Sequence, residues 1–215
     1  MHVPDGFLAP QVWAPLWAGA VPAWAWAVRA GRALRDERTL PLLAAVTAIA
    51  FVGSSIPVPL PGGTSVHLTL VGLLAVLFGV PAAFVALSLV FAVQALLLGQ
   101  GGVTCLGLHA LAIGLAGTSA AALAWRALRR VSSPAGLFAA GFAGVVVPAL
   151  LVAVVLGVQP LVAHGADGQP LYFPFGLRTT LLAIVPVHAL LGCVEGALTV
   201  AAGGVLARLG RPVAP

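Results

Sequence analysis

The feature that constrains this chain most is the scarcity of charge across long apolar stretches. Hydrophobic residues make up 61% of the 215 positions and charged residues only 7%, whereas a soluble domain carries about 25% charged residues. So few charges cannot cover a surface that faces water. The sequence therefore predicts an all-α integral membrane protein, since helices of about 20 apolar residues are long enough to span a bilayer.

Seven apolar runs follow one another along the chain, and we expect about seven transmembrane helices in a single membrane domain that covers residues 1–215. The runs cover residues 11–30, 39–55, 67–79, 81–98, 104–125, 135–157 and 178–207. Between the second and third runs, residues 56–66 contain three prolines and two glycines, a composition that predicts a loop. A second break is expected at residues 79–81, which read Gly-Val-Pro.

The arginines predict the orientation of these helices. Nine of the ten arginines follow the first, fifth and seventh runs, and only Arg178 departs from the pattern. Because loops rich in positive charge stay in the cytoplasm, the N-terminus is expected outside and the C-terminus in the cytoplasm of a multi-pass protein of the inner (plasma) membrane. Residues 56–66, 99–103 and 158–177 then lie outside, on the same face as the N-terminus.

The sequence offers little support for enzymatic or nucleic-acid-binding chemistry. It contains no HExxH motif, no phosphate-binding P-loop and no GxSxG motif, so we expect neither catalysis nor ATP hydrolysis by this chain itself. The net charge of +5 comes from arginines in short loops without interleaved aromatic residues, which does not indicate binding to nucleic acid. Cys105 and Cys193 lie in apolar runs and are expected to be small hydrophobic packing residues.

The first residues carry the clearest chemical signal. The chain opens Met-His-Val-Pro-Asp-Gly-Phe, lacks the basic start of a signal peptide, and is expected to keep Met1. The terminal amine of Met1, the amide nitrogen of His2 and the His2 imidazole are close enough along the backbone to form fused chelate rings on one metal ion. A fourth nitrogen would complete a square, the geometry that suits Ni(II) or Cu(II).

His67 is a candidate for that fourth nitrogen. It stands where the residue 56–66 loop enters the third apolar run, on the same predicted face as His2. Neutral imidazole is a common metal ligand and is usually oriented by a hydrogen-bond acceptor. The alternative interpretation is a histidine at a helix N-terminus that is hydrogen-bonded to Thr64 or Ser65.

Four stretches of this sequence resemble the motifs of one transporter family. They are residues 1–8 (MHVPDGFL), 59–67 (PLPGGTSVH), 93–104 (VQALLLGQGGVT) and 188–196 (HALLGCVEG). The chain is similar, nearly from end to end, to the substrate-binding (S) subunits of nickel/cobalt energy-coupling factor transporters. The first two motifs are specific, whereas the other two are mostly patterns of helix packing.

The resemblance implies a seven-helix S subunit that binds Ni(II) or Co(II) as its transported substrate, with no organic cofactor. The four nitrogens implied are the Met1 amine, the His2 amide, the His2 imidazole and the His67 imidazole. Thr64, Ser65 and His109 are expected around these ligands. The implied partners are a transmembrane coupling (T) subunit and two ATPase subunits, with a small accessory membrane subunit as a further candidate, in contact with membrane lipid.

Several polar residues leave alternatives open. His109 and Ala112 stand where the family usually has asparagine, so His109 is either a polar contact near the site or a packing histidine. His164 is either solvated or involved in metal capture. His188 and Glu195 are seven residues apart and share a helix face; Glu195 serves either helix packing or contact with the coupling subunit.

A second candidate function is an S subunit for an organic micronutrient, such as a vitamin, in the same transporter class. It would need a large external pocket with aromatic residues, and these are sparse on the predicted outer face: Phe7, Tyr172, Phe173 and Phe175. For the metal itself, a planar four-nitrogen site favours nickel, but the donor set accepts cobalt as well.

Overall fold

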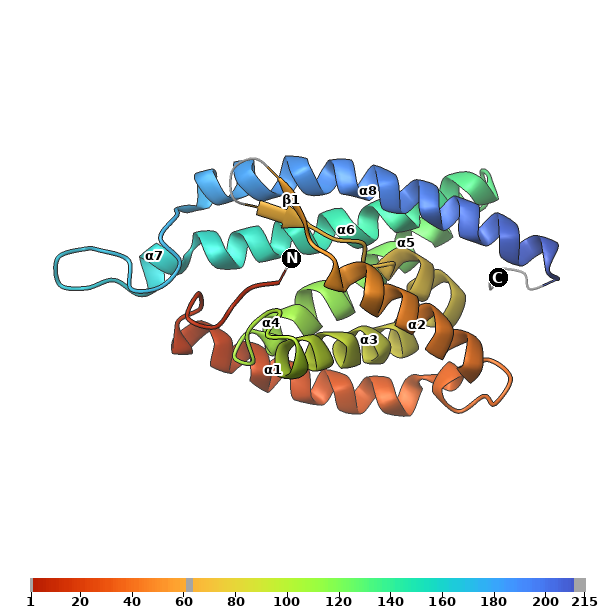
Figure 1. Cartoon of the computed structure of the whole chain (residues 1–215), viewed down its shortest axis with the longest axis horizontal. Coiled ribbons are helices and arrows are strands. Elements are labelled where there is room, and N and C mark those ends of the chain that lie inside the picture. Colours follow the sequence, from red (N-terminus) through yellow and green to blue (C-terminus); the bar gives the residue numbers. More distant parts are fainter. Residues whose placement is uncertain (1, 61–63, 211–215) are drawn as a thin grey trace.

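The computed structural model describes residues 2–60 and 64–210, which fold into an elongated bundle of helices (Figure 1). In the view of Figure 1, α8 lies along one long side of the bundle, α1 lies along the other, and α6 runs between them. The elements in chain order are α1 (Pro10–Ala30), η1 (Arg32–Leu34), α2 (Leu40–Ser55), β1 (Val58–Leu60), β2 (Thr64–Val66), α3 (Val71–Leu97), α4 (Leu106–Leu108), the π-helical segment η2 (His109–Gly117), α5 (Thr118–Leu128), α6 (Ser133–Gly157), α7 (Gln159–Val162) and α8 (Leu177–Arg208).

Four helical stretches in the described residues are long and apolar enough to cross a membrane, which supports the prediction of an integral membrane protein. They are Val71–Leu97, Leu106–Leu128, Ser133–Val162 and Leu177–Arg208, and α2 is a shorter apolar helix. The second stretch joins α4, η2 and α5 end to end. The count of seven spanning helices and the orientation of the termini stay predictions.

The third apolar run differs from the prediction. The chain breaks helical geometry at Gly79 (φ 79°, ψ 162°), within the predicted 79–81 break, and α3 begins only at Val71. The helical part before the break, residues 71–78, is therefore about 12 Å long at 1.5 Å per residue, too short for a hydrocarbon core of about 30 Å. Residues 67–70, predicted as the start of a span, instead form a bend that leads into α3.

Residues 56–66, predicted to be a loop, contain a short β-hairpin. Strands β1 and β2 pair antiparallel with Val58 opposite Val66 and Pro59 opposite Ser65. The prolines misled the prediction because a proline is tolerated in a strand whose other edge is free, and each strand of a two-stranded sheet has such an edge. The hairpin leads directly to His67.

Glycines bring α3, α6 and α8 into close contact. A Cβ atom added to Gly72 of α3 would lie 2.5 Å from the Cα of Gly141 in α6, and one added to Gly141 would lie 2.6 Å from the carbonyl oxygen of Glu195 in α8. Small residues of this kind allow helix backbones to approach closely in lipid. The three helices therefore form a tightly packed centre that supports the loops at one end of the bundle.

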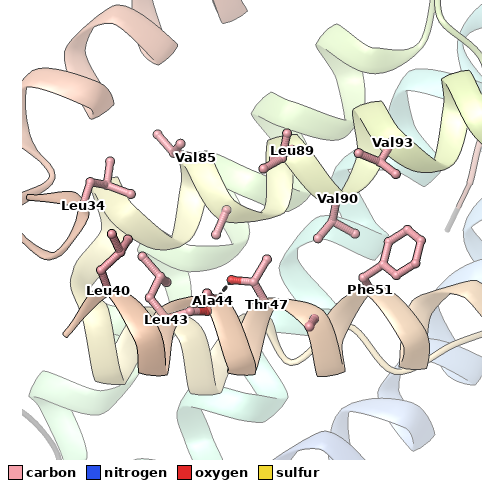
Figure 2. A pocket seen from close by; sticks show the side chains of 12 residues that line it. Leu34, Leu40, Leu43, Ala44, Thr47, Phe51, Val85, Leu89, Val90 and Val93 are labelled. Carbon is pink, nitrogen blue, oxygen red and sulfur yellow. Dashed lines mark hydrogen bonds between the residues drawn. The ribbon is translucent and has the colours of Figure 1, made fainter. Parts of the chain in front are cut away.

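An apolar groove runs between α2 and α3 (Figure 2). Its cavity volume is about 460 Å³, and among its lining residues only Thr47 carries a polar side chain. The Thr47 hydroxyl donates a 2.7 Å hydrogen bond to the carbonyl oxygen of Leu43. The groove therefore presents an apolar surface that suits lipid and provides no nitrogen ligand for a metal ion.

We predict that Gly72→Ala destabilises the protein, because the added methyl group meets the backbone of α6. Overpacking of this kind costs about 1–3 kcal/mol, which should appear as a lower thermal-unfolding midpoint in detergent. Gly204→Ala in α8 is the matched control, since a Cβ atom there has nothing within 4 Å. Equal midpoints for the two variants would contradict the close α3–α6 packing.

Candidate metal site

The N-terminal segment, residues 2–9, runs from the start of α1 back into the middle of the bundle (Figure 1). Its backbone pairs with distant parts of the chain: the Gly102 amide donates to the Val3 carbonyl (2.8 Å), and the Ala9 amide donates to the Gln159 side-chain oxygen (2.9 Å). Val3 is buried. These contacts hold His2 at a defined position inside the protein. Met1 lies outside the described residues.

Asp5 fastens this segment to the turn before α4. Its carboxylate accepts hydrogen bonds from the amides of Val103 (3.1 Å) and Thr104 (2.8 Å) and from the Thr104 hydroxyl. The hydroxyl bond holds the pKa of Asp5 below its usual value, so the carboxylate is charged at neutral pH. A negative group here also faces the N-terminus of a helix, where unpaired amides favour it.

His2 and His67 lie next to each other. Their ring centroids are 4.6 Å apart, and the ring planes meet at 40°. Burial lowers the pKa of His2 to about 4 and the pKa of His67 to about 2. Both imidazoles are therefore neutral at pH 7, the form in which a ring nitrogen has a lone pair for a metal ion.

Gln94 of α3 fixes which His2 nitrogen faces the site. The His2 Nε2 atom lies 2.9 Å from the Gln94 Oε1 atom, and the Gln94 amide nitrogen donates to the hydroxyl groups of Ser54 (2.8 Å) and Ser55 (3.0 Å). Because a carboxamide oxygen only accepts, Nε2 of neutral His2 carries the proton and Nδ1 keeps the lone pair. Nδ1 is the nitrogen closer to the backbone, as a chelate with the His2 amide requires.

His109 contacts the same segment through the backbone. Its Nε2 atom accepts a 3.0 Å hydrogen bond from the Val3 amide, and its ring centroid lies 6.1 Å from that of His2. The lone pair of His109 Nε2 is thus occupied by this hydrogen bond. Gly101 (φ +83°) lets the 99–103 turn approach these rings, since a Cβ atom there would lie 3.1 Å from the His109 ring and 3.4 Å from the His2 ring.

The β-hairpin leads directly to His67. His67 is buried, and it follows β2 directly. Thr64 is the first residue of β2, and Ser65 is exposed. The roles predicted for Thr64, Ser65 and His109 around a metal ion stay predictions.

The remaining candidate residues lie elsewhere. His164 is exposed in the 158–177 loop, where its ring nitrogen lies 3.3 Å from the Gly165 carbonyl oxygen. His188 is buried in α8, with Nδ1 2.8 Å from the Ile184 carbonyl oxygen. Within residues 2–60 and 64–210, no three side chains among histidine, cysteine, aspartate and glutamate are arranged to hold a metal ion. The two adjacent imidazoles are therefore the nitrogen-rich centre of the described structure.

Sequence reasoning missed Gln94 and Asp5 as parts of this site. Gln94 was predicted only within a motif of helix packing, although a glutamine deep in an apolar helix, fully buried here, is a signal for a specific partner because buried polar groups need one. Asp5 was noted only as part of the opening motif. Its partners, Val103 and Thr104, are about a hundred positions away, and nothing local indicates them.

The fold and the site together define an integral membrane protein in which a partly buried histidine of the N-terminal segment, His2, lies next to the buried His67. Residues 2–212 match the family described as "Cobalt uptake substrate-specific transmembrane region", and the chain belongs to that family.

The relatives and solved structures similar to this chain are metal transporters by name. A fused nickel transport protein, NikMN, from Rhodobacter capsulatus is 38% identical over 87% of this chain and 56% of its own length. A cobalt transport protein, CbiM, from Geobacter sulfurreducens is 34% identical over 93% of this chain and 57% of its own length. The chain thus spans a little over half of each relative. The crystal structure of a truncated transition metal transporter superimposes with a TM-score of 0.91 at 33% identity, over 97% of this chain and 99% of that one.

We predict that Gly102→Ala releases the N-terminal segment, because the new methyl group meets the backbone nitrogen and carboxylate of Asp5. A cost of about 1–3 kcal/mol corresponds to about 5- to 150-fold faster amide exchange, which hydrogen-exchange mass spectrometry of peptides covering residues 3–9 would detect. Gly204→Ala is again the control. Unchanged exchange in the Gly102 variant would show that the segment is not held against the turn.

Proposed function

We propose that this chain is the substrate-specific subunit of an ATP-driven, energy-coupling-factor type importer and captures Ni(II) or Co(II) with high affinity on the external face of the membrane. The observation that carries the proposal is the pair of neutral imidazoles of His2, which is partly buried, and His67, which is buried, with ring centroids 4.6 Å apart. Membership of a cobalt-uptake family and similarity to proteins named as nickel and cobalt transporters support it.

The proposed donors are four nitrogens: the Met1 amine, the His2 amide, the His2 Nδ1 atom and a ring nitrogen of His67. The Gln94 hydrogen bond supports this set because it leaves Nδ1 of His2 unprotonated. A deprotonated amide would contribute one negative charge and so offset part of the charge of a divalent ion in a buried site, where an unpaired charge is costly. The Val3–His109 hydrogen bond would hold the neighbouring peptide in place.

A square of nitrogen donors favours nickel over cobalt, because square-planar nitrogen sites suit Ni(II). Selection between the two metals in cells also depends on which is available, so both are included in the proposal. An S subunit for an organic micronutrient is not favoured by the comparisons, and the groove between α2 and α3 lacks the polar groups that orient such a ligand.

In this proposal the chain has no catalytic role. Two separate ATPase subunits hydrolyse ATP, a transmembrane coupling subunit connects them to this chain, and a small accessory membrane subunit completes the set. The complex lies in the inner membrane, and transport follows from reorientation of the loaded subunit in the bilayer. Reconstitution of this chain with and without such partners, followed by ATP-dependent uptake of radioactive nickel or cobalt, tests this part of the proposal.

We predict that His67→Asn abolishes the planar absorption spectrum of the nickel-loaded protein, because the fourth nitrogen is lost. One residue added before Met1 should have the same effect, since it moves the amine out of the chelate. Nickel titration of purified protein, followed by absorption spectroscopy, measures both. His164→Asn is the matched control, because that histidine is exposed. If the extended protein bound nickel with unchanged affinity and spectrum, the chelate would be ruled out.

The pH dependence of metal affinity provides a separate test. Burial lowers the pKa of His2 to about 4 and the pKa of His67 to about 2, so both rings are already deprotonated at pH 6–8 and release no protons on binding. The Met1 ammonium and the His2 amide would release theirs, and nickel affinity should therefore fall as the pH is lowered through this range. Calorimetry in buffers of different ionisation enthalpy measures the protons released. Binding without proton release would contradict the proposed donors.

A further inference from the structure

Glu195 of α8 is fully buried, and its carboxylate is directed at the backbone that follows His67. It accepts hydrogen bonds from the Thr69 amide, from the Thr69 hydroxyl (3.1 Å) and from the Leu70 amide, which lies 3.1 Å from both carboxylate oxygens. An acidic group inside a membrane protein is costly unless it is paired. Here three donors from one short stretch of chain pair it.

That stretch is a bend with an unfavourable backbone conformation. Leu70 has left-handed backbone angles (φ 54°, ψ 26°) and is the only residue other than glycine with a positive φ in the described part of the chain. Such a conformation is unfavourable for a residue with a side chain and persists only when its surroundings impose it. The Glu195 carboxylate accepts hydrogen bonds from the amides of both residues of this bend, Thr69 and Leu70.

The position of Glu195 is itself fixed by helix packing. The Thr199 hydroxyl donates a 2.7 Å hydrogen bond to the Glu195 carbonyl oxygen. On the facing side, a Cβ atom on Gly141 would lie 2.6 Å from that same oxygen. Helix α8 therefore packs closely against α6 at Glu195. The Glu195 side chain links this packed region to the bend that follows His67.

His67 is thus held from both sides along the chain. The hairpin ends at Val66, directly before it, and the bend bonded by Glu195 begins at Thr69, two residues after it. The carboxylate oxygens are occupied by backbone donors, so Glu195 is not arranged to serve as a ligand. Its contacts are instead with residues 69 and 70, two and three positions after His67.

We propose that Glu195 is a positioning residue of the metal site: by fixing the bend after His67, it sets the geometry of the fourth nitrogen ligand. This inference rests on the proposed function and deepens it, because it connects α8, a helix that contributes no ligand, to metal binding. The side chain acts through the backbone of residues 69 and 70 and does not touch the metal ion.

The test is Glu195→Gln, which keeps the shape of the side chain but presents an NH₂ group to the donors of the bend. We expect nickel affinity to fall about 10- to 100-fold, as for other groups that orient ligands. The nickel spectrum should also change toward that of His67→Asn, a shift that loss of packing alone would not produce. Thr180→Val is the matched control, because it removes a hydroxyl hydrogen bond elsewhere in α8, to the Gly176 carbonyl oxygen (3.0 Å), without touching Glu195 or the bend. Its affinity and spectrum should match the wild type.

The outcomes separate this inference from the proposed function. If the wild-type protein binds no nickel or cobalt, the proposed function fails. If the wild type binds nickel and Glu195→Gln binds it with the same affinity and spectrum, only the inference is overturned. If Glu195→Gln fails to fold, Thr69→Val tests the inference, because it removes only the hydroxyl donor to the carboxylate. We then expect a smaller loss of nickel affinity in the same direction. Unchanged affinity would overturn the role of the carboxylate.

Discussion

The hydrogen bond between His2 and Gln94 is the interaction on which the candidate site depends most. It joins a residue at the start of the chain to a buried amide in the middle of α3, and it decides which nitrogen of the His2 ring carries a proton. Burial of the ring has the complementary effect of keeping it neutral. Together they leave one nitrogen of the His2 ring unprotonated, so metal binding at the proposed site would need little rearrangement of this ring.

The same principle explains the polar residues around the site. In a protein with so few charges, each buried polar group needs a defined partner, because leaving it unpaired costs more than a typical hydrogen bond contributes. Asp5 is paired with the turn before α4, and Glu195 with the bend before α3. Each of these acids accepts hydrogen bonds from backbone amides outside regular helices. Together with Gln159, which binds the Ala9 amide, they link non-helical segments to distant parts of the chain.

Much of the fold was predictable because hydropathy and helix length are local properties. The apolar runs from residue 81 onward became helices within a few residues of their predicted bounds, and the break at Gly79 was visible as Gly-Val-Pro. The hairpin was missed because strand pairing overrode the local signal of three prolines. The short first half of α3 was missed because hydropathy does not distinguish an apolar bend from the first turn of a helix.

The two adjacent histidines could be singled out from the sequence, whereas the groups that support them could not, and their role as metal ligands stays a prediction. His2 and His67 stood out because few donors exist and both were assigned to one face. Gln94, Asp5 and the bend at Leu70 could not be inferred, because their importance lies in contacts between positions 92 to 125 residues apart. Those contacts exist only once the helices have packed, and a single sequence contains no local trace of them.

The contacts of the N-terminal segment also determine when the site can form. Its partners include Gln159 and Phe173, both of which follow α6 in the chain. During synthesis the first residues are therefore made long before the groups that hold them, and they can reach their final place only after most of the protein has been inserted. A partly made chain lacks the groups that hold His2, so this segment, although it is made before α1, is among the last parts of the molecule to reach its final place.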